Sequence, residues 1–427
     1  MNNKSKSFLF LKLLFFCIAC NNNSDQKKQS ATDSLLKGTY AYDAEFLRTH
    51  TRRVIELKNE EGNAKILLSA DYQGRVMTST AEGDSGTSYG WINYALLASS
   101  EKKKQFNPVG GEERFWMGPE GGQYSIYFKA KDSFSFPNWQ VPAVIDTISY
   151  DVTLSDKTQV VFSKKTTLIN YSGTVFDIAI ERKIKLLDKN QAETKLNNVI
   201  PSGLRFVGYE TENKIQNTGT ADWIKDKGLL SIWLLGMFTP SPKTIVIIPF
   251  STPSFDRLLP DSVTGPAPPA RHFITDNYFG TIPADRLKVK DSILYFTCDG
   301  KYRSKIGLSP MIAKPIAGSF DFEKNILTIV IPQVYKNASY VNSKWEIQKE
   351  PYNGDVINSY NDGPLADGTQ MGPFYEIESS SPALELKKGE TGEYKQVTCH
   401  FQGDYNTLQQ LAKQLLGVDL NDLKKEL

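Results

Sequence analysis

Histidine and cysteine are scarce in this sequence, with three and four residues respectively among 427. No histidine belongs to an HExxH motif or to a cluster with cysteine, so we expect no metal site built from protein ligands. Glycine-rich phosphate loops of the Walker and Rossmann types are also missing, which argues against the usual NTPase and dehydrogenase templates, and no cofactor is expected. Charge of one sign is not in excess either. Because 50 basic and 48 acidic residues nearly cancel, a nucleic acid partner is not expected.

The chain begins with a segment that is typical of protein export. Residues 1–20 combine a basic start with an apolar run that is too short to remain as a transmembrane helix. Residues 17–20 (CIAC) resemble the bacterial lipobox, in which the last cysteine is acylated, although Cys17 stands where leucine is usual. We expect lipid attachment at Cys20, a flexible tether over 21–37, and anchoring to the periplasmic or cell-surface face of a bacterial membrane. The alternative is an ordinary secretory signal that contains a cysteine by chance.

The rest of the sequence is rich in short β-type segments. Hydrophobic residues make up 40% of the chain and aromatic residues 11%, which is enough for a large core. Runs rich in Val, Ile, Thr, Tyr and Phe occur at 64–70, 123–128, 159–164, 176–184, 244–249 and 325–330. The 176–184 run alternates and predicts one solvent-facing side, whereas 245–248 is apolar throughout and should be covered on both faces. Two packed sheets account for both patterns.

Only the end of the chain has a clear helical pattern. Leucines near helical spacing predict an amphipathic helix over 405–416, which Gly417 should end. No composition change divides the strand-rich region, so we expect a single domain over 38–427 that includes this helix. Cys298 and Cys399 lie in expected strands, where they are either two buried thiols or a disulfide.

The segment Gly110–Gln123 is the most unusual in the chain. It places three acids, an arginine and a tryptophan between glycine pairs. Carboxylates and arginine hydrogen-bond hydroxyl groups directionally, while a tryptophan ring offers a flat apolar face to a sugar ring. Glu113, Arg114, Trp116 and Glu120 are therefore candidates for binding a carbohydrate. The alternative is a tight turn whose charges pair with one another.

Two later segments could contribute to the same site. The loop over 345–364 interleaves aromatic, amide and acid groups, among them Asn361 and Asp362, although a self-satisfied turn is the alternative for each residue. In a strand that starts near residue 374, Glu376 and Glu378 lie on one face, where they are either solvated or directed into a cleft.

Together these segments resemble the galactose mutarotase-like superfamily, in particular a branch of exported bacterial lipoproteins. The similarity is carried by residues 110–122 (GGEERFWMGPEGG), 374–390 (FYEIESSSPALELKKGE) and the strand over 391–401, and it extends over about 40–403. It implies an all-β fold, a large antiparallel β supersandwich, here with a short C-terminal helix. It also implies a sugar site on the concave face of a large sheet.

The resemblance implies a mechanism with one departure. Mutarotases of this superfamily use a histidine as general acid and a late glutamate as general base, and Glu376 is the counterpart of that glutamate. The familiar Asn-His segment is missing, because residues 170–173 (NYSG) occupy the comparable strand end. Arg114 or His272 is expected to stabilise the developing charge or to supply the acid instead.

The sequence thus predicts an exported lipoprotein that recognises a carbohydrate. Its expected activity is that of an aldose-epimerase-like isomerase with a carboxylate base. A non-catalytic glycan-binding lipoprotein is the main alternative, and a polysaccharide lyase or hydrolase is a further one. The residues expected to bind the sugar are Glu113, Trp116, Glu120, Asn361 and Asp362.

Overall fold

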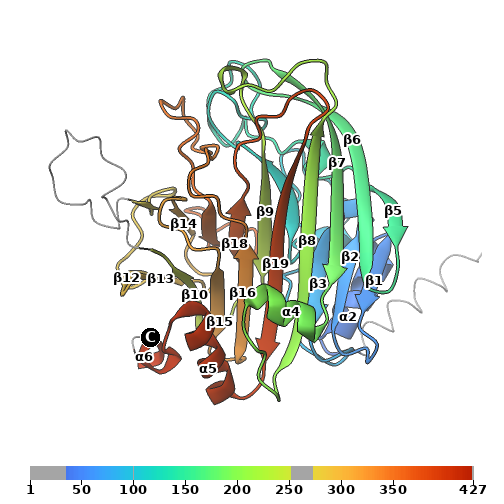
Figure 1. Ribbon diagram of the computed structural model, residues 1–427, viewed down its shortest axis with the longest axis vertical. Coiled ribbons are helices and arrows are strands. Elements are labelled where there is room, and N and C mark those ends of the chain that lie inside the picture. The colour runs from blue at the N-terminus through green and yellow to red at the C-terminus, as the bar shows by residue number, and fades with distance from the viewer. Residues whose placement is uncertain (1–34, 100, 252–272, 426–427) are drawn as a thin grey trace, which may run out of the picture.

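A computed structural model of the protein describes residues 35–99, 101–251 and 273–425, which form a sandwich of antiparallel sheets (Figure 1). The larger sheet has ten strands, in the spatial order β12 (Leu287–Lys290), β13 (Ile293–Thr297), β10 (Thr244–Pro249), β15 (Ala317–Asp321), β16 (Ile326–Pro332), β19 (Thr391–Gln402), β8 (Arg205–Asn217), β7 (Val175–Leu186), β6 (Gln159–Ile169) and β5 (Asp151–Ser155). The second sheet has six strands, in the order β11 (Ile274–Thr275), β14 (Ser304–Leu308), β17 (Ile357–Asn361), β18 (Tyr375–Ser380), β9 (Ser231–Phe238) and β4 (Arg114–Gly118).

A third, three-stranded sheet continues the smaller layer. It contains β1 (Val54–Lys58), β2 (Lys65–Ser69) and β3 (Arg75–Thr80), and a bridge between Val76 and Glu113 links it to β4. The main apolar core lies between this layer and the ten-stranded sheet. The all-β fold with large packed antiparallel sheets is therefore confirmed.

The two strand patterns seen in the sequence have the expected structural causes. Along β7, Phe176, Ile178 and Ile180 are buried in the core while the residues between them are more exposed. Every residue of β10 is buried, because a second apolar cluster covers its other face. Both predictions are confirmed.

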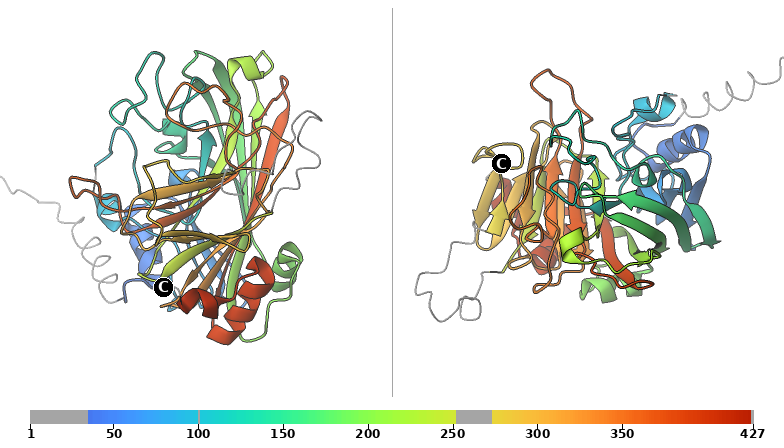
Figure 2. Two further views of the ribbon diagram at one scale, coloured as in Figure 1. Left: turned by 90° about the vertical axis from the view of Figure 1, so that its left-hand side faces the viewer. Right: turned by 90° about the horizontal axis from the view of Figure 1, so that it is seen from above.

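Helices supply that second cover. α4 (Lys189–Leu196), α5 (Tyr405–Leu416) and α6 (Leu420–Lys425) lie together over one end of the ten-stranded sheet (Figures 1 and 2). The predicted C-terminal helix is confirmed with its bounds. It starts where the Asp404 side chain accepts a hydrogen bond from the Thr407 backbone, and it ends at Gly417, whose φ is 72°.

Two helices and one loop differ from the sequence-based expectations. α2 (Tyr40–His50) and α4 were not expected, although Tyr40, Ala44 and Leu47 of α2 recur at helical spacing. Their signals were the caps, Thr39 for α2 and a capping box at Asp188 for α4. Residues 123–128 do not form the predicted strand but a largely buried loop. The aromatic residues of this run are there because the loop is buried, and they do not indicate a strand.

The remaining described elements are short. They are α3 (Tyr94–Ala98) and the 3₁₀ turns η1 (Ala70–Tyr72), η2 (Ala143–Ile145) and η3 (Lys225–Lys227). Within the described ranges, no helix is both long and apolar enough to cross a membrane. Cys298 and Cys399 are both free and buried, which decides between the two alternatives for them. The predicted signal peptide, Cys20, residues 21–34 of the tether and His272 lie outside the described residues.

Candidate functional site

The outer face of the six-stranded sheet, turned away from the ten-stranded sheet, carries the candidate site. On β4, Phe115 faces the ten-stranded sheet, because the Arg182 guanidinium of β7 lies 5.9 Å from its ring centroid, so the alternating residues Arg114 and Trp116 point to the outer face. Trp116 pairs with Trp233 of β9, which places both indoles on that face.

The neighbouring strands add charged groups to the same face. On β18 the Tyr375 hydroxyl bonds to Ser319 of the ten-stranded sheet, so Glu376 and Glu378 point the other way. Across β17 and β14, Tyr360 pairs with both Glu376 and Lys305. The strand register thus aligns an arginine, two glutamates, a tyrosine and a lysine across four strands.

Two ion pairs organise these charges. Arg114 Nη2 donates to Glu376 Oε1, and only 3% of the arginine and 7% of the glutamate side chain is exposed. Lys305 Nζ donates to Glu378 Oε2 over 2.8 Å, with 14% and 0% of the two side chains exposed. Trp233 Nε1 donates to the same Glu378 oxygen over 3.0 Å. Glu378 is therefore the deepest carboxylate, and Lys305 lies nearer the solvent.

The electrostatics of the pair Glu376–Glu378 differ from those of exposed acids. Burial raises the pKa of Glu376 well above its usual range; the Arg114 guanidinium opposes this, and the adjacent Glu378 carboxyl adds to it. For Lys305, burial alone would lower the pKa, but Glu378 and Glu120 outweigh that effect and raise it. The site therefore holds a carboxyl group that takes up a proton more readily than an exposed acid does, beside an ammonium group that keeps its proton.

Aromatic rings border the charged groups. The Arg114 guanidinium lies 4.7 Å from the Trp116 ring centroid, and Lys305 Nζ lies 4.9 Å from that of Trp233. The two indoles meet edge to face, with centroids 5.6 Å apart. From the covering loops, Tyr127 packs against Trp116 at 5.7 Å.

Glu120 enters the same site from a covering loop. Burial and the Glu378 carboxylate together raise its pKa to about 7, against the opposing effects of Lys305 and of the indoles of Trp139 and Trp345. The rings of Trp139 and Trp345 stack with centroids 5.9 Å apart. Glu120 is thus a third carboxyl group near Lys305, framed by two indoles.

The other side of Lys305 holds a hydrogen-bonded pair. The Tyr278 hydroxyl donates to Asp355 Oδ2 over 2.6 Å, and Asn358 Nδ2 donates to the same hydroxyl over 3.3 Å. Gly307 of β14 makes room for this arrangement, because a Cβ there would lie 2.1 Å from Asp355 Oδ2. The polar array therefore extends across the sheet from Asp355 to Arg114.

Several buried polar atoms of this array have spare hydrogen-bonding capacity. Among the described residues, Arg114 Nε and Nη1, Trp116 Nε1 and Glu378 Oε1 have no hydrogen-bond partner. Buried polar groups are rarely left unpaired in folded proteins, so such a concentration indicates a place where a polar ligand or water completes the network.

Sequence comparison matches residues 38–427 to the family of unknown function DUF6786. The chain belongs to this family. No curated protein matches the sequence.

Several solved structures have a similar chain path. The Slr1438 protein from Synechocystis sp. PCC 6803 is 12% identical, with a TM-score of 0.46 over 82% of this chain and 96% of its own. A galactose mutarotase-like protein from Lactobacillus casei ATCC 334 is 11% identical, with a TM-score of 0.45 over 82% and 100%. A galactose mutarotase related enzyme from Lactobacillus acidophilus is 9% identical, with a TM-score of 0.43 over 82% and 97%.

In this member of the DUF6786 family, four of the predicted site residues lie together. Arg114, Trp116, Glu120 and Glu376 all belong to the array on the outer face. Trp116 is deeper than a residue that stacks on a ligand at the surface, since only 4% of it is exposed. Asp362 lies beside the array, where it accepts a hydrogen bond from the Tyr360 hydroxyl over 2.7 Å.

Two further predicted residues point elsewhere. Glu113 is directed into the core, where Arg182 Nη2 and Gln396 Nε2 donate to it over 2.8 and 2.9 Å. Asn361 lies on the inner face of β17 and is occupied with the backbone of Gly300 and Tyr302. In the structure, both residues serve to hold the fold together.

The sequence did not identify Lys305, Trp233 or Tyr278, and it included Asp355 only as part of the candidate loop over 345–364. Lys305 is a single lysine in a short strand, and Trp233 lies in a strand that is otherwise apolar. Only the pairing of strands far apart in the sequence brings them to Glu378. No local pattern carried that information.

A serine-hydrolase pattern in the sequence has another explanation. Residues 86–90 (GTSYG) have GxSxG spacing, but Ser88 Oγ donates to Asp43 and contacts Thr78 Oγ1 at 2.6 Å. His400 bonds to Glu112 and Thr328 instead. Ser88 therefore anchors α2 to the sheet and is not arranged as a nucleophile.

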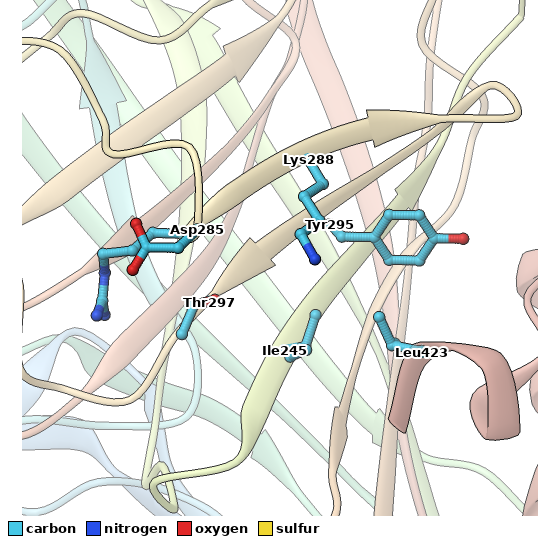
Figure 3. Close-up of a pocket in the computed structure, with 7 residues that line it drawn as sticks. Ile245, Asp285, Lys288, Tyr295, Thr297 and Leu423 are labelled. Atoms are coloured by element: carbon cyan, nitrogen blue, oxygen red, sulfur yellow. The ribbon is translucent and has the colours of Figure 1, made fainter. Parts of the chain in front are cut away.

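Other concavities are poorer candidates. A pocket of about 20 Å³ between β10, β13 and α6 has room for about one water molecule (Figure 3). A wider hollow of about 590 Å³ over β6, β7 and β8 is lined by polar side chains without an aromatic ring. Within the described part of the chain, no group of three or more acidic, histidine or cysteine residues could hold a metal ion.

Proposed function

We propose that this protein binds a carbohydrate on the outer face of its six-stranded sheet and interconverts the anomers of that sugar. The observation that carries this proposal is the array of two ion pairs, Arg114–Glu376 and Lys305–Glu378, bordered by indole rings. Carboxylate, guanidinium and ammonium groups form directional hydrogen bonds with hydroxyl groups. Indoles complement the apolar C–H surface of a pyranose.

Glu376 is the group we assign to proton transfer. Opening a sugar ring requires removal of the anomeric hydroxyl proton, cleavage of the bond between C1 and the ring oxygen, and protonation of that oxygen. A carboxyl group whose pKa is raised towards neutrality can give up and recover a proton under the same conditions. Glu376 acts as the base in its ionised form, and Arg114 then stabilises the charge that develops beside it.

The second carboxyl group and the lysine suit the complementary role. Glu120, whose pKa is raised to about 7, can protonate the ring oxygen while Glu376 takes the other proton, and the Lys305 ammonium group then stabilises the Glu120 carboxylate that remains. Such a division of roles would replace the histidine of the mutarotases that the sequence resembles. The cellular setting that we propose is lipid anchoring through Cys20 at an exported face of a bacterial membrane.

A Glu376→Gln substitution tests the catalytic assignment. Glutamine keeps the size and the acceptor oxygen but cannot take a proton, so anomer interconversion should slow by about 10²- to 10⁴-fold while binding persists. NMR or polarimetry on a panel of hexoses and pentoses, read against the spontaneous rate, measures this. The matched control is Glu346→Gln, which removes an exposed acid from a covering loop and should leave the rate unchanged.

A non-catalytic glycan-binding protein is the second candidate. It is favoured by the close pairing of Arg114 with Glu376, because paired, buried charges also suit a static binding surface. If the wild-type protein binds a sugar but accelerates anomer exchange for none, this candidate replaces the enzyme. If no sugar binds at all, both are wrong.

A further inference from the structure

The hydrogen-bonding capacity left over in the site is unevenly divided between donors and acceptors. Among the described residues of β4, three buried side-chain nitrogen atoms have no hydrogen-bond partner, Arg114 Nε, Arg114 Nη1 and Trp116 Nε1. They lie on one strand, with the guanidinium over the indole. A single carboxylate oxygen, Glu378 Oε1, is left as an acceptor. A hydroxyl can serve either need, whereas a surplus of donors calls for a ligand group that only accepts.

We propose that the sugar recognised by this site carries a carboxylate group, as a uronic acid does, and that Arg114 and Trp116 bind that carboxylate. This inference rests on the proposed function and adds the substrate class. A carboxylate accepts several N–H bonds at once and forms its strongest ones with guanidinium. Both donors are held in place by packing, since only 3% of Arg114 and 4% of Trp116 is exposed.

The charges of the site favour an anion with one negative charge. Lys305 is held by Glu378, so Arg114 is the cation with donors to spare. Its present partner Glu376 can release it by taking up a proton, which converts an ion pair into a neutral carboxyl group beside a free guanidinium. One such cation balances a carboxylate, whereas a phosphate group with nearly two negative charges would remain undercompensated.

The surroundings of Glu376 determine how this exchange responds to pH. Arg114 from β4, Glu378 from its own strand, Lys305 from β14 and Tyr360 from β17 face it. Arg75 and Asp146, which carry opposite charges, both interact electrostatically with Arg114. Uronate binding should therefore be accompanied by proton uptake at Glu376, and affinity should fall as the pH rises above the pKa of that group. With a uronate bound, the roles proposed for the two carboxyl groups are exchanged: Glu376 donates its proton to the ring oxygen, and Glu120 accepts the anomeric proton.

The test is calorimetry on the full-length protein with D-glucuronate and D-galacturonate, compared with D-glucose and D-galactose. We expect each uronate to bind about tenfold or more tightly than its neutral counterpart at pH 6, because charge-assisted hydrogen bonds are worth about that much. At pH 8 the difference in affinity between uronates and neutral sugars should become smaller. Titrations at pH 8 in buffers of different ionisation enthalpy should show proton uptake with the uronates alone.

Two variants separate the proposed contact from a general loss of structure. Trp116→Phe keeps the ring but removes the N–H donor, and it should reduce uronate affinity about threefold to tenfold with little effect on neutral sugars. Trp223→Phe, at a buried indole that packs on Phe176 away from the site, is the matched control and should bind like the wild type. Arg114→Lys keeps the charge but loses the fork of donors, and uronate affinity should fall tenfold or more.

The possible outcomes distinguish this inference from the proposed function. If neutral sugars bind as tightly as uronates, the uronate inference is wrong and the carbohydrate site stands. If glucose 6-phosphate binds more tightly than either uronate, the site takes a dianion and the inference is again wrong. If no sugar of either kind binds, the proposed function fails together with it.

Discussion

At the scale of single residues, the charged side chains of this protein divide between two roles. Arg182 and Glu113 are both fully buried in the core, where Asn213 and Gln396 complete their hydrogen bonding. Arg114 and Glu376 are paired just as closely on the outer face, yet two arginine nitrogens remain without partners among the described residues. A complete network indicates a structural pair, and an incomplete one indicates a binding group.

This distinction leads to a prediction for Glu113→Gln. Removing one partner of a fully buried pair leaves the Arg182 charge uncompensated, so the free energy of unfolding should fall by about 3 to 5 kcal/mol. Urea denaturation measures the loss, and calorimetry on the folded protein should show unchanged sugar affinity. The control Glu210→Gln removes a partly exposed pair with Lys195 and should cost less than about 1 kcal/mol. If Glu113→Gln kept normal stability but lost sugar affinity, Glu113 would be a sugar-binding residue and not a structural one.

The residue scale also shows what alternation along a strand could and could not predict. The rule that places Glu376 and Glu378 on one face was applied and holds in β18. The same rule separates the neighbours Glu113 and Arg114, but the segment was read as a loop and not as β4, so both were assigned to the sugar site. The secondary structure of this segment was predicted wrongly, whereas the chemistry of its residues was not the cause of the error.

At the scale of elements, the site depends on β14 allowing close approach. Asp355 lies across this strand at Gly307 and accepts a hydrogen bond from the Tyr278 hydroxyl, and the ring centroid of Tyr278 lies 5.6 Å from Lys305 Nζ. The backbone at Gly307 does not require positive φ. The glycine is therefore needed for space and not for its conformation.

Gly307→Ala should consequently weaken binding more than folding. The new Cβ would displace the end of the Asp355 side chain, which can rotate away at modest cost, but Tyr278 would lose its acceptor. We expect sugar affinity to fall about threefold to tenfold and the melting temperature to change little. Tyr278→Phe should reproduce the loss. Gly219→Ala, where the nearest atom would lie 3.3 Å from the new Cβ, is the control and should affect neither property. A large fall in melting temperature would show that Gly307 instead supports the fold.

The sequence could predict several helices and strands but not how the strands pair. β6, β7, β10, β16 and α5 were recognisable because their apolar periodicity is strong. The pairing of β9 with β18 joins segments more than a hundred residues apart, and β14 reaches β18 only through β17. Since Lys305 and Trp233 reach Glu378 only through that pairing, half of the site was not visible before the sheets were known.

At the scale of the whole molecule, the two large sheets of the sandwich have different roles. Three helices cover part of one face of the ten-stranded sheet, so that sheet is largely a support. The outer face of the six-stranded sheet is covered instead by loops that bring Glu120, Trp139 and Trp345 to the charged array. A site built from sheet strands for precision and from loops for enclosure suits recognition of a small polar ligand.

Attachment of the whole molecule to a membrane is a prediction from the N-terminal sequence. Acylation of Cys20 would supply a diacylglycerol and an amide-linked chain, and two such hydrophobic groups are what stable attachment needs. Cys20→Ser should therefore move the full-length protein from the membrane fraction to the soluble fraction and remove the lipid mass from the processed N-terminus. Cys17→Ser, three residues earlier, is the matched control and should leave both unchanged. Membrane fractionation that survives Cys20→Ser would mean that the cysteine belongs to an ordinary cleaved signal, and that the sugar site works unattached.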